Sequence, residues 1–203
     1  MAVMAHVNLT PAADRLAGLV AGVSDDQLAG PTPCPDYTLG DLIDHVGGLA
    51  LAFNAAGQKE FGPYTEGTPT GDAARLGSDW RVRIRRDLGV LARTWQQPGA
   101  WAGMTRIARM DAPAEMVGIT LADELLVHGW DMAMASGQKF DYEPDVLEAA
   151  RSFLAQIANP DAPAGPDVVF GPPRELPDSA PPLDRVVAMA GRDHAWSAGP
   201  ERD

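Results

Sequence analysis

The sequence predicts an all-α fold, a bundle of about four long helices joined by proline-rich connectors and followed by an extended C-terminal tail. Apolar residues recur at helical spacing in segments 8–23, 38–57, 78–97 and 111–137, and capping residues stand at the starts of these segments. Of the 203 residues, 45% are hydrophobic and 22% charged, which is typical of a globular protein with a sizeable core. We therefore expect residues 1–203 to form a single domain.

The first predicted helix covers residues 8–23. Thr10 followed by Pro11 supplies an N-cap and a proline in the first turn, where a backbone N–H is not needed. The connector 24–37 is proline-rich in its second half and cannot be helical there. Cys34 lies in this connector and could be a packing residue, a nucleophile or a fourth metal ligand, of which packing is favoured. As the single cysteine, it forms no internal disulfide and fits a reducing compartment.

The second predicted helix covers residues 38–57 and begins with a capping box. The Thr38 hydroxyl accepts a backbone N–H, and Asp41 places an acid in the first turn. His45 falls within the apolar stripe of this helix, where a satisfied core histidine is the common alternative to a ligand. Residues 58–77 form a long loop rich in glycine and proline, and loops of that length are usually functional or mobile. We expect this loop near the mouth of a site.

The third predicted helix covers residues 78–97, with Ser78 as N-cap and an apolar stripe that includes Trp80 and Trp95. Its arginines between positions 81 and 86 could attract a carboxylate substrate, but a solvated face is favoured because acidic residues stand beside them.

The segment between the third and fourth predicted helices is not expected to be helical. Residues 98–110 carry glycines that argue against a stable helix and favour a short strand or an extended crossover. Asp111 and Pro113 are expected to cap and start the fourth helix. Gly137 is expected to end it in the left-handed conformation.

The fourth helix carries the candidate chemistry. Residues four apart on a helix project side by side, so Glu124 and His128 interrupt one apolar face together. They could hydrogen-bond each other, face water, or grip one metal ion. With His45 as a third ligand, two imidazoles and a carboxylate suit Zn²⁺, Ni²⁺, Fe²⁺ or Mn²⁺ and leave positions open for catalysis.

The C-terminal part predicts two further helices. One opens at Pro144, with apolar residues from Val146 to Ile157 inward, and stops at Asn159 and Pro160. Residues 161–182 form the extended tail, in which residues 168–170 pair or pack briefly. A short last helix over residues 183–190 follows.

Three stretches resemble the actinobacterial metal-binding branch of the DinB/YfiT-like superfamily, related to the N-terminal domain of mycothiol-dependent maleylpyruvate isomerase. They are TPCPDYTLGDLIDHVGGL, ELLVHGWDMAMASGQ and PPLDRVVAMAGRDHAW. The resemblance implies a DinB-like four-helix bundle in which His45, Glu124 and His128 hold one divalent metal, with Zn²⁺ favoured.

The resemblance also implies a thiol-dependent enzyme. Mycothiol would bind the metal as a thiolate nucleophile for isomerisation or conjugation of a small electrophile. Asp131 could orient a ligand or the incoming thiol, or simply bond the nearby backbone. The related isomerase carries a further C-terminal domain, and in its place we expect a proline-rich tail and a short helix here. A metal-binding or stress-related protein without turnover is the alternative, and a homodimer is compatible with the sequence.

Charge argues against two classes of partner. The net charge of −12 and the isoelectric point near 4.6 would repel nucleic acid and anionic membranes. The sequence also lacks a signal-type leader and any run of 18 apolar residues, so we expect a cytoplasmic protein.

Overall fold

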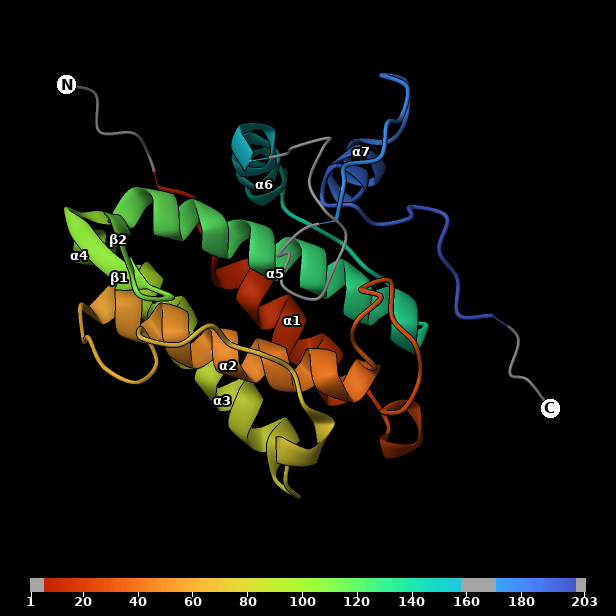
Figure 1. Cartoon of the computed structure of the whole chain (residues 1–203), viewed down its shortest axis with the longest axis horizontal. Coiled ribbons are helices and arrows are strands. Elements are labelled where there is room, and N and C mark those ends of the chain that lie inside the picture. The colour runs from red at the N-terminus through yellow and green to blue at the C-terminus, as the bar shows by residue number, and fades with distance from the viewer. Residues whose placement is uncertain (1–5, 158–170, 200–203) are drawn as a thin grey trace.

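The computed structural model describes residues 6–157 and 171–199. In these ranges the chain forms seven α-helices, two short 3₁₀-helices and one two-stranded antiparallel sheet (Figure 1). The predicted all-α class therefore holds broadly, with a small hairpin added. The helices are α1 (Thr10–Gly22), α2 (Leu39–Gln58), α3 (Trp80–Trp95), α4 (Pro98–Trp101), α5 (Ala114–Ser136), α6 (Pro144–Ile157) and α7 (Pro182–Met189).

Helix α5 lies at the centre of the arrangement. It packs on α1, α2 and α6, while α3 packs on α1 and α2, and α7 packs on α6. Figure 1 shows α6 and α7 on the opposite side of α5 from α2 and α3. A helix covered on several sides must be apolar almost all round, and α5 is buried over most of its length. Asp123, His128 and Asp131 in the middle of the helix are consequently taken out of water.

The start of α2 matches its prediction. The Thr38 hydroxyl accepts the backbone N–H of Asp41 at 3.2 Å, and the Asp41 carboxylate accepts the backbone N–H of Thr38 at 3.0 Å. This reciprocal capping fixes the first turn of the helix. Leu42 and Phe53 are buried as the apolar stripe predicted. The helix therefore presents a well-defined inward face.

Two predicted N-caps were wrong by one residue. The N-cap of α1 is Leu9, whose carbonyl accepts the backbone N–H of Ala13 at 3.0 Å, and the Asn8 side chain accepts the N–H of Thr10 at 3.2 Å. The N-cap of α3 is Asp79 rather than Ser78, and it makes no side-chain capping bond. The predicted stripe of α3 is nevertheless buried from end to end: Trp80, Ile84, Leu88, Leu91 and Trp95.

The predicted crossover is a short helix followed by a hairpin. Strand β1 (Met104–Ile107) pairs with β2 (Met110–Pro113) in antiparallel register. The prediction that Asp111 and Pro113 cap and start the fourth helix was wrong, because both residues belong to strand β2. The Asp111 carboxylate accepts a hydrogen bond from Arg106 across the hairpin at 2.8 Å and does not cap the helix. Helix α5 begins at Ala114 instead. The preceding α4 forms although glycine disfavours it, because the buried Trp101 indole donates to the backbone carbonyl of Trp95 at 2.8 Å.

The later elements mostly follow the prediction. Helix α5 ends at Gly137, whose φ of 70° lies in the left-handed region, and α6 begins at Pro144. Ile157 is 43% exposed and not inward as expected, because it is the last residue of α6. The predicted stop at Asn159 and Pro160 and the predicted pairing at 168–170 lie outside the described residues. Residues 171–181 have neither helix nor strand.

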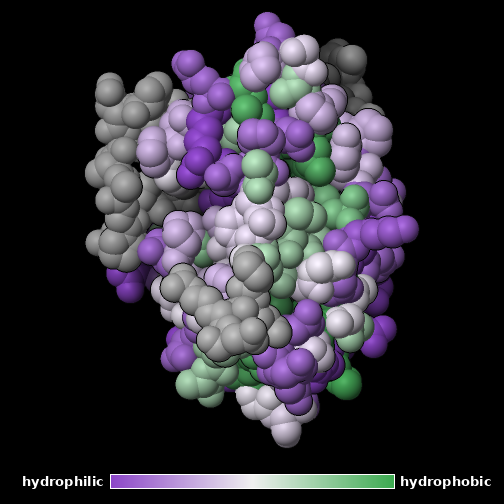
Figure 2. Space-filling view, turned by 90° about the vertical axis from the view of Figure 1, so that its right-hand side faces the viewer, coloured by the Kyte–Doolittle hydropathy of each residue, from purple (hydrophilic) through white to green (hydrophobic). Residues whose placement is uncertain are grey.

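The face drawn in Figure 2 carries many hydrophilic residues between smaller apolar areas. Within the described ranges, no helix is both long and apolar enough to cross a bilayer.

Candidate metal centre

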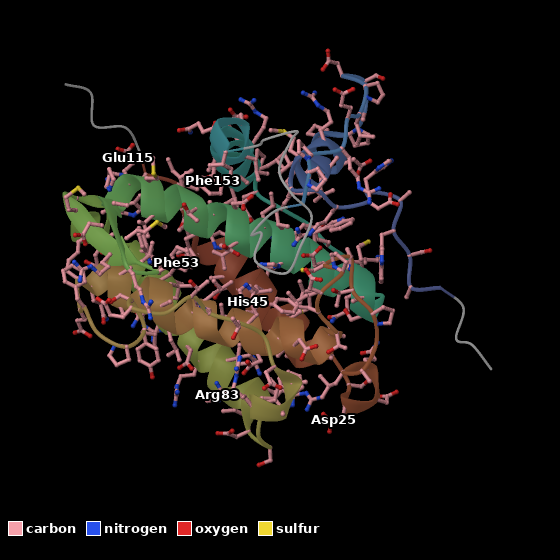
Figure 3. All side chains as sticks on the ribbon, viewed as in Figure 1. Asp25, His45, Phe53, Arg83, Glu115 and Phe153 are labelled. Atoms are coloured by element: carbon pink, nitrogen blue, oxygen red, sulfur yellow. The ribbon has the colours of Figure 1, made fainter. Side chains whose placement is uncertain are left out.

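Three side chains from two helices converge between α2 and α5. The potential ligand atoms of His45, Glu124 and His128 all lie within 4.8 Å of one another. The His128 Nε2 is 3.0 Å from a Glu124 carboxylate oxygen, and the His45 and His128 rings meet edge to face with centroids 5.0 Å apart. His45 lies on the side of α2 that faces α5 (Figure 3). The structure thus brings together the three residues that the sequence singled out.

His45 is oriented by the loop that follows its helix. Its Nδ1 lies 3.1 Å from the backbone carbonyl oxygen of Pro69, and since a carbonyl only accepts, Nδ1 carries the proton. The Nε2 atom is then unprotonated and can donate its lone pair to a cation. Burial, together with the neighbouring His128, lowers the pKa of His45 to about 4, so the ring is neutral at neutral pH.

The loop segment 69–75 is fixed on α2 by several contacts. Asp41 accepts a backbone N–H of this segment at 2.8 Å, and the Tyr37 hydroxyl accepts the Gly71 N–H at 3.1 Å. A Cβ atom at Gly71 would overlap the backbone carbonyl oxygen of Asp41, so only glycine permits this approach. These contacts hold the carbonyl that orients His45, as expected for a loop near a site.

Glu124 and His128 form a buried polar pair. Burial lowers the pKa of His128, but its hydrogen bonds to Asp131 and Glu124 outweigh burial and raise this pKa to about 9. Burial raises the pKa of Glu124, but the hydrogen bond to His128 outweighs it and holds the pKa below its usual value. Without a cation the pair is therefore carboxylate and imidazolium. His128 is only 8% exposed, which excludes the alternative that this face turns to water.

Asp131 lies directly behind His128. Its carboxylate oxygen is 3.2 Å from the His128 Nδ1 and 2.9 Å from Nη2 of Arg192. Burial raises the pKa of Asp131, but the charge of Arg192 outweighs it and keeps the acid ionised. Arg192 was missed by the sequence analysis. Although it lies in the stretch AGRDHAW, nothing local indicates a contact with a residue 61 positions away.

Asp123 is a second residue that the sequence analysis missed. It is fully buried, and neither carboxylate oxygen has a hydrogen-bond partner in the part of the chain that the structure describes. Burial and the nearby Glu124 charge raise its pKa well above the usual value. The available signal was a charged residue within a helix that is apolar almost all round.

Two other candidates from the sequence do not join the cluster. Cys34 is not among the grouped ligands, and burial raises the pKa of its thiol to about 11. Two of the α3 arginines are bound to loop groups: Arg81 to the Val23 carbonyl and Asp25, and Arg83 to the Leu76 carbonyl. The neighbouring Arg85 and Arg86 are exposed, as predicted for a solvated face.

The donor set fits a divalent transition metal. Two imidazole nitrogens and one carboxylate oxygen suit Zn²⁺, Fe²⁺, Ni²⁺ or Mn²⁺. Both histidines also bind an oxygen acceptor through the other ring nitrogen, His45 through Pro69 and His128 through Asp131. Metal-binding histidines usually have such a partner, because it fixes the tautomer and the ring orientation. Three protein donors leave coordination positions for other groups.

Comparisons with known proteins agree with this architecture. The profile of the family described as "Mycothiol maleylpyruvate isomerase N-terminal domain" matches residues 9–133. An uncharacterised protein recorded in two strains of Mycobacterium tuberculosis is 31% identical over 195 residues, covering 93% of this chain and 96% of the relative. The crystal structure of a histidine-to-alanine mutant of mycothiol-dependent maleylpyruvate isomerase shares the fold, with a TM-score of 0.53 at 16% identity. That match covers 71% of this chain and 65% of the isomerase.

Proposed function

The chain belongs to the mycothiol maleylpyruvate isomerase N-terminal domain family, and from this premise we propose that it is a divalent-metal enzyme that uses mycothiol as its nucleophile. The reaction class is isomerisation of, or conjugation to, a small electrophile. We take Zn²⁺ as the metal. The observation that carries the proposal is the convergence of His45, Glu124 and His128, with both histidines oriented through their second ring nitrogen.

Each residue has a distinct role in this proposal. His45, Glu124 and His128 hold the cation, and when bound the cation acts as a Lewis acid that lowers the pKa of a thiol in an open position. Asp131 accepts the Nδ1 proton of His128 and so aims the opposite nitrogen at the site. The Pro69 carbonyl does the same for His45. The side chains around the cluster are largely buried, which strengthens electrostatic interactions inside it.

The remaining parts of the proposal concern the whole chain. We propose that α1, α2, α3 and α5 form a DinB-like four-helix bundle and that residues 1–203 form one cytoplasmic domain around it. In support, each of these four helices packs on two others of the set.

Calorimetry with mycothiol tests the proposal. The thiol should bind the Zn²⁺-loaded protein and bind the stripped protein much more weakly, because coordination stabilises the deprotonated sulfur. Its apparent affinity should rise with pH until the free thiol ionises near pH 8.5. Glu124→Gln, loaded under the same conditions, is the matched control and should behave like stripped protein.

Two results would contradict this reading. The first is equal binding of mycothiol to loaded and stripped protein, and the second is binding to neither form. Either result would reject the thiol-dependent enzyme and favour the alternative function, a metal-binding protein without turnover. If the thiol does bind, maleylpyruvate is the first electrophile to test for turnover, since the solved relative is named for it.

A further inference from the structure

We propose that Arg192, in the segment after α7, is a positioning residue of the metal centre: it holds the Asp131 carboxylate in the orientation that receives the Nδ1 proton of His128. This inference rests on the proposed metal centre. It adds to that centre a residue from outside the range 9–133 that the family profile matches.

The guanidinium of Arg192 fixes the plane of the carboxylate. Its Nε atom lies 3.2 and 3.3 Å from the two Asp131 oxygens, and Nη2 lies 2.9 Å from Oδ2. The third nitrogen, Nη1, donates to the backbone carbonyl of Ala190 at 3.0 Å, which fixes the guanidinium itself. A planar guanidinium held on two sides can set the orientation of a carboxylate, whereas a single ammonium cannot.

The orientation reaches His128 through one shared atom. The Oδ2 atom of Asp131 contacts both Arg192 Nη2 and His128 Nδ1, at 2.9 and 3.2 Å. Rotation of the carboxylate would break one of these two contacts. Holding the carboxylate therefore holds the imidazole, with its Nε2 toward Glu124 and the site.

Burial makes this arrangement matter energetically. Asp131 is 0% exposed and Arg192 is 5% exposed, so each charge depends on the other for compensation. Among the described residues, the Arg192 side chain hydrogen-bonds to Asp131 and Ala190, and not to the three candidate ligands. The contacts of Arg192 therefore reach the candidate ligands through Asp131 and His128, while its positive charge also helps to lower the pKa of Glu124. Arg192→Lys keeps that charge and so separates positioning from the electrostatic effect.

Zn²⁺ affinity of the full-length protein, measured by competition with a chelator, tests the inference. Arg192→Met should weaken Zn²⁺ binding by about 10- to 100-fold, the range typical of groups that orient metal ligands. Arg192→Lys keeps the charge but loses the planar contact, so it should also bind more weakly than wild type. Arg185→Met is the control, because Arg185 is a half-buried arginine of α7 that pairs with Asp178 outside the centre, and it should leave the affinity unchanged.

A double-mutant cycle and a spectrum separate positioning from a general structural role. Asp131→Asn combined with Arg192→Met should bind Zn²⁺ no more weakly than the worse single variant, because both act through the same carboxylate. The visible spectrum of the Co²⁺-loaded protein should change in Arg192→Met and Arg192→Lys but not in Arg185→Met, because the His128 geometry changes. If Arg192→Met does not fold, as judged by circular dichroism, Arg192→Lys and Asp131→Asn decide the question.

If both Arg192 variants have the Zn²⁺ affinity and the Co²⁺ spectrum of wild type, the positioning role is wrong, although the metal centre can still stand. The positioning role is also wrong if the losses of Zn²⁺ affinity in the two single variants add up in the double variant. Absence of stoichiometric Zn²⁺ binding in wild type would overturn the metal centre and this inference together.

Discussion

The two histidines of the cluster differ in protonation although their rings touch. His45 is hydrogen-bonded to the Pro69 carbonyl, and burial together with the neighbouring His128 lowers its pKa to about 4. His128 lies between two carboxylates, and their hydrogen bonds raise its pKa to about 9 against the effect of burial. At neutral pH the protein without metal therefore holds one neutral and one charged imidazole at the same site. A cation that binds Nε2 of both rings must displace the Nε2 proton of His128, whereas the Nε2 atom of the neutral His45 carries no proton to displace.

This difference predicts that Zn²⁺ binding at pH 7 releases about one proton. Since the proton comes from His128, the apparent affinity should rise with pH and level off near pH 9, where the metal-free protein no longer holds it. Calorimetry in buffers of different ionisation enthalpy measures the number of protons. Asp131→Asn removes one of the carboxylates that stabilise the imidazolium, so it should release fewer. Release of no proton by wild type would show that the site is assigned wrongly.

Cys34 yields a second prediction for a single residue. Burial raises the pKa of its thiol to about 11, so little thiolate is present at pH 8. We expect Cys34 to react with iodoacetamide on the order of 100-fold more slowly than free cysteine. Cys34→Ser should retain metal content and any thiol-dependent activity. Fast alkylation, or loss of activity in a folded Cys34→Ser protein, would indicate that the nucleophile is in the chain itself.

At the scale of elements, the centre depends on how the loop segment 69–75 sits on α2. Gly71→Ala should push this segment away from Asp41 and displace the Pro69 carbonyl from His45. We expect Zn²⁺ affinity to fall about 10-fold, as for other groups that orient ligands. Gly62→Ala, in the same loop, meets no atom within 4 Å and should leave affinity unchanged. Equal affinities of the two variants would mean that the loop does not orient His45.

The helices also show which features a sequence can predict. The capping box of α2 and the left-handed end of α5 involve neighbouring residues, and both were predicted correctly. The pairing of Glu124 with His128 is local as well, being one helical turn. Asp111 was misassigned because its cross-hairpin contact with Arg106 competes with capping, and residue spacing does not show which of the two prevails.

The contacts that complete the site are long-range. Pro69 is 24 residues from His45, and Arg192 is 61 residues from Asp131. Helical periodicity places a side chain on a face but does not identify the loop or terminal segment that covers that face. The candidate ligands and Asp131 could therefore be predicted from the sequence, while the contacts of Pro69 with His45 and of Arg192 with Asp131 required the structure.

At the scale of the whole molecule, α5 connects the helices of the fold with the candidate metal centre. It is covered by α1, α2 and α6, it supplies two candidate ligands and Asp131, and through Asp131 it connects to the segment after α7. Burial of this helix makes its charged residues depend on partners. A cation between α2 and α5 would give Glu124 and both histidines such a partner. Folding and metal binding should therefore be coupled, so that removal of the metal lowers the melting temperature.

Metal content of the purified protein, measured by mass spectrometry after loading with Zn²⁺ and desalting, tests the central claim most directly. Wild type should retain one Zn²⁺ per chain. His194→Ala, which removes an exposed histidine outside the cluster, should retain the same amount, and His45→Ala should retain none. Full occupancy in His45→Ala, or no retained Zn²⁺ in wild type, would contradict the assignment of this metal centre.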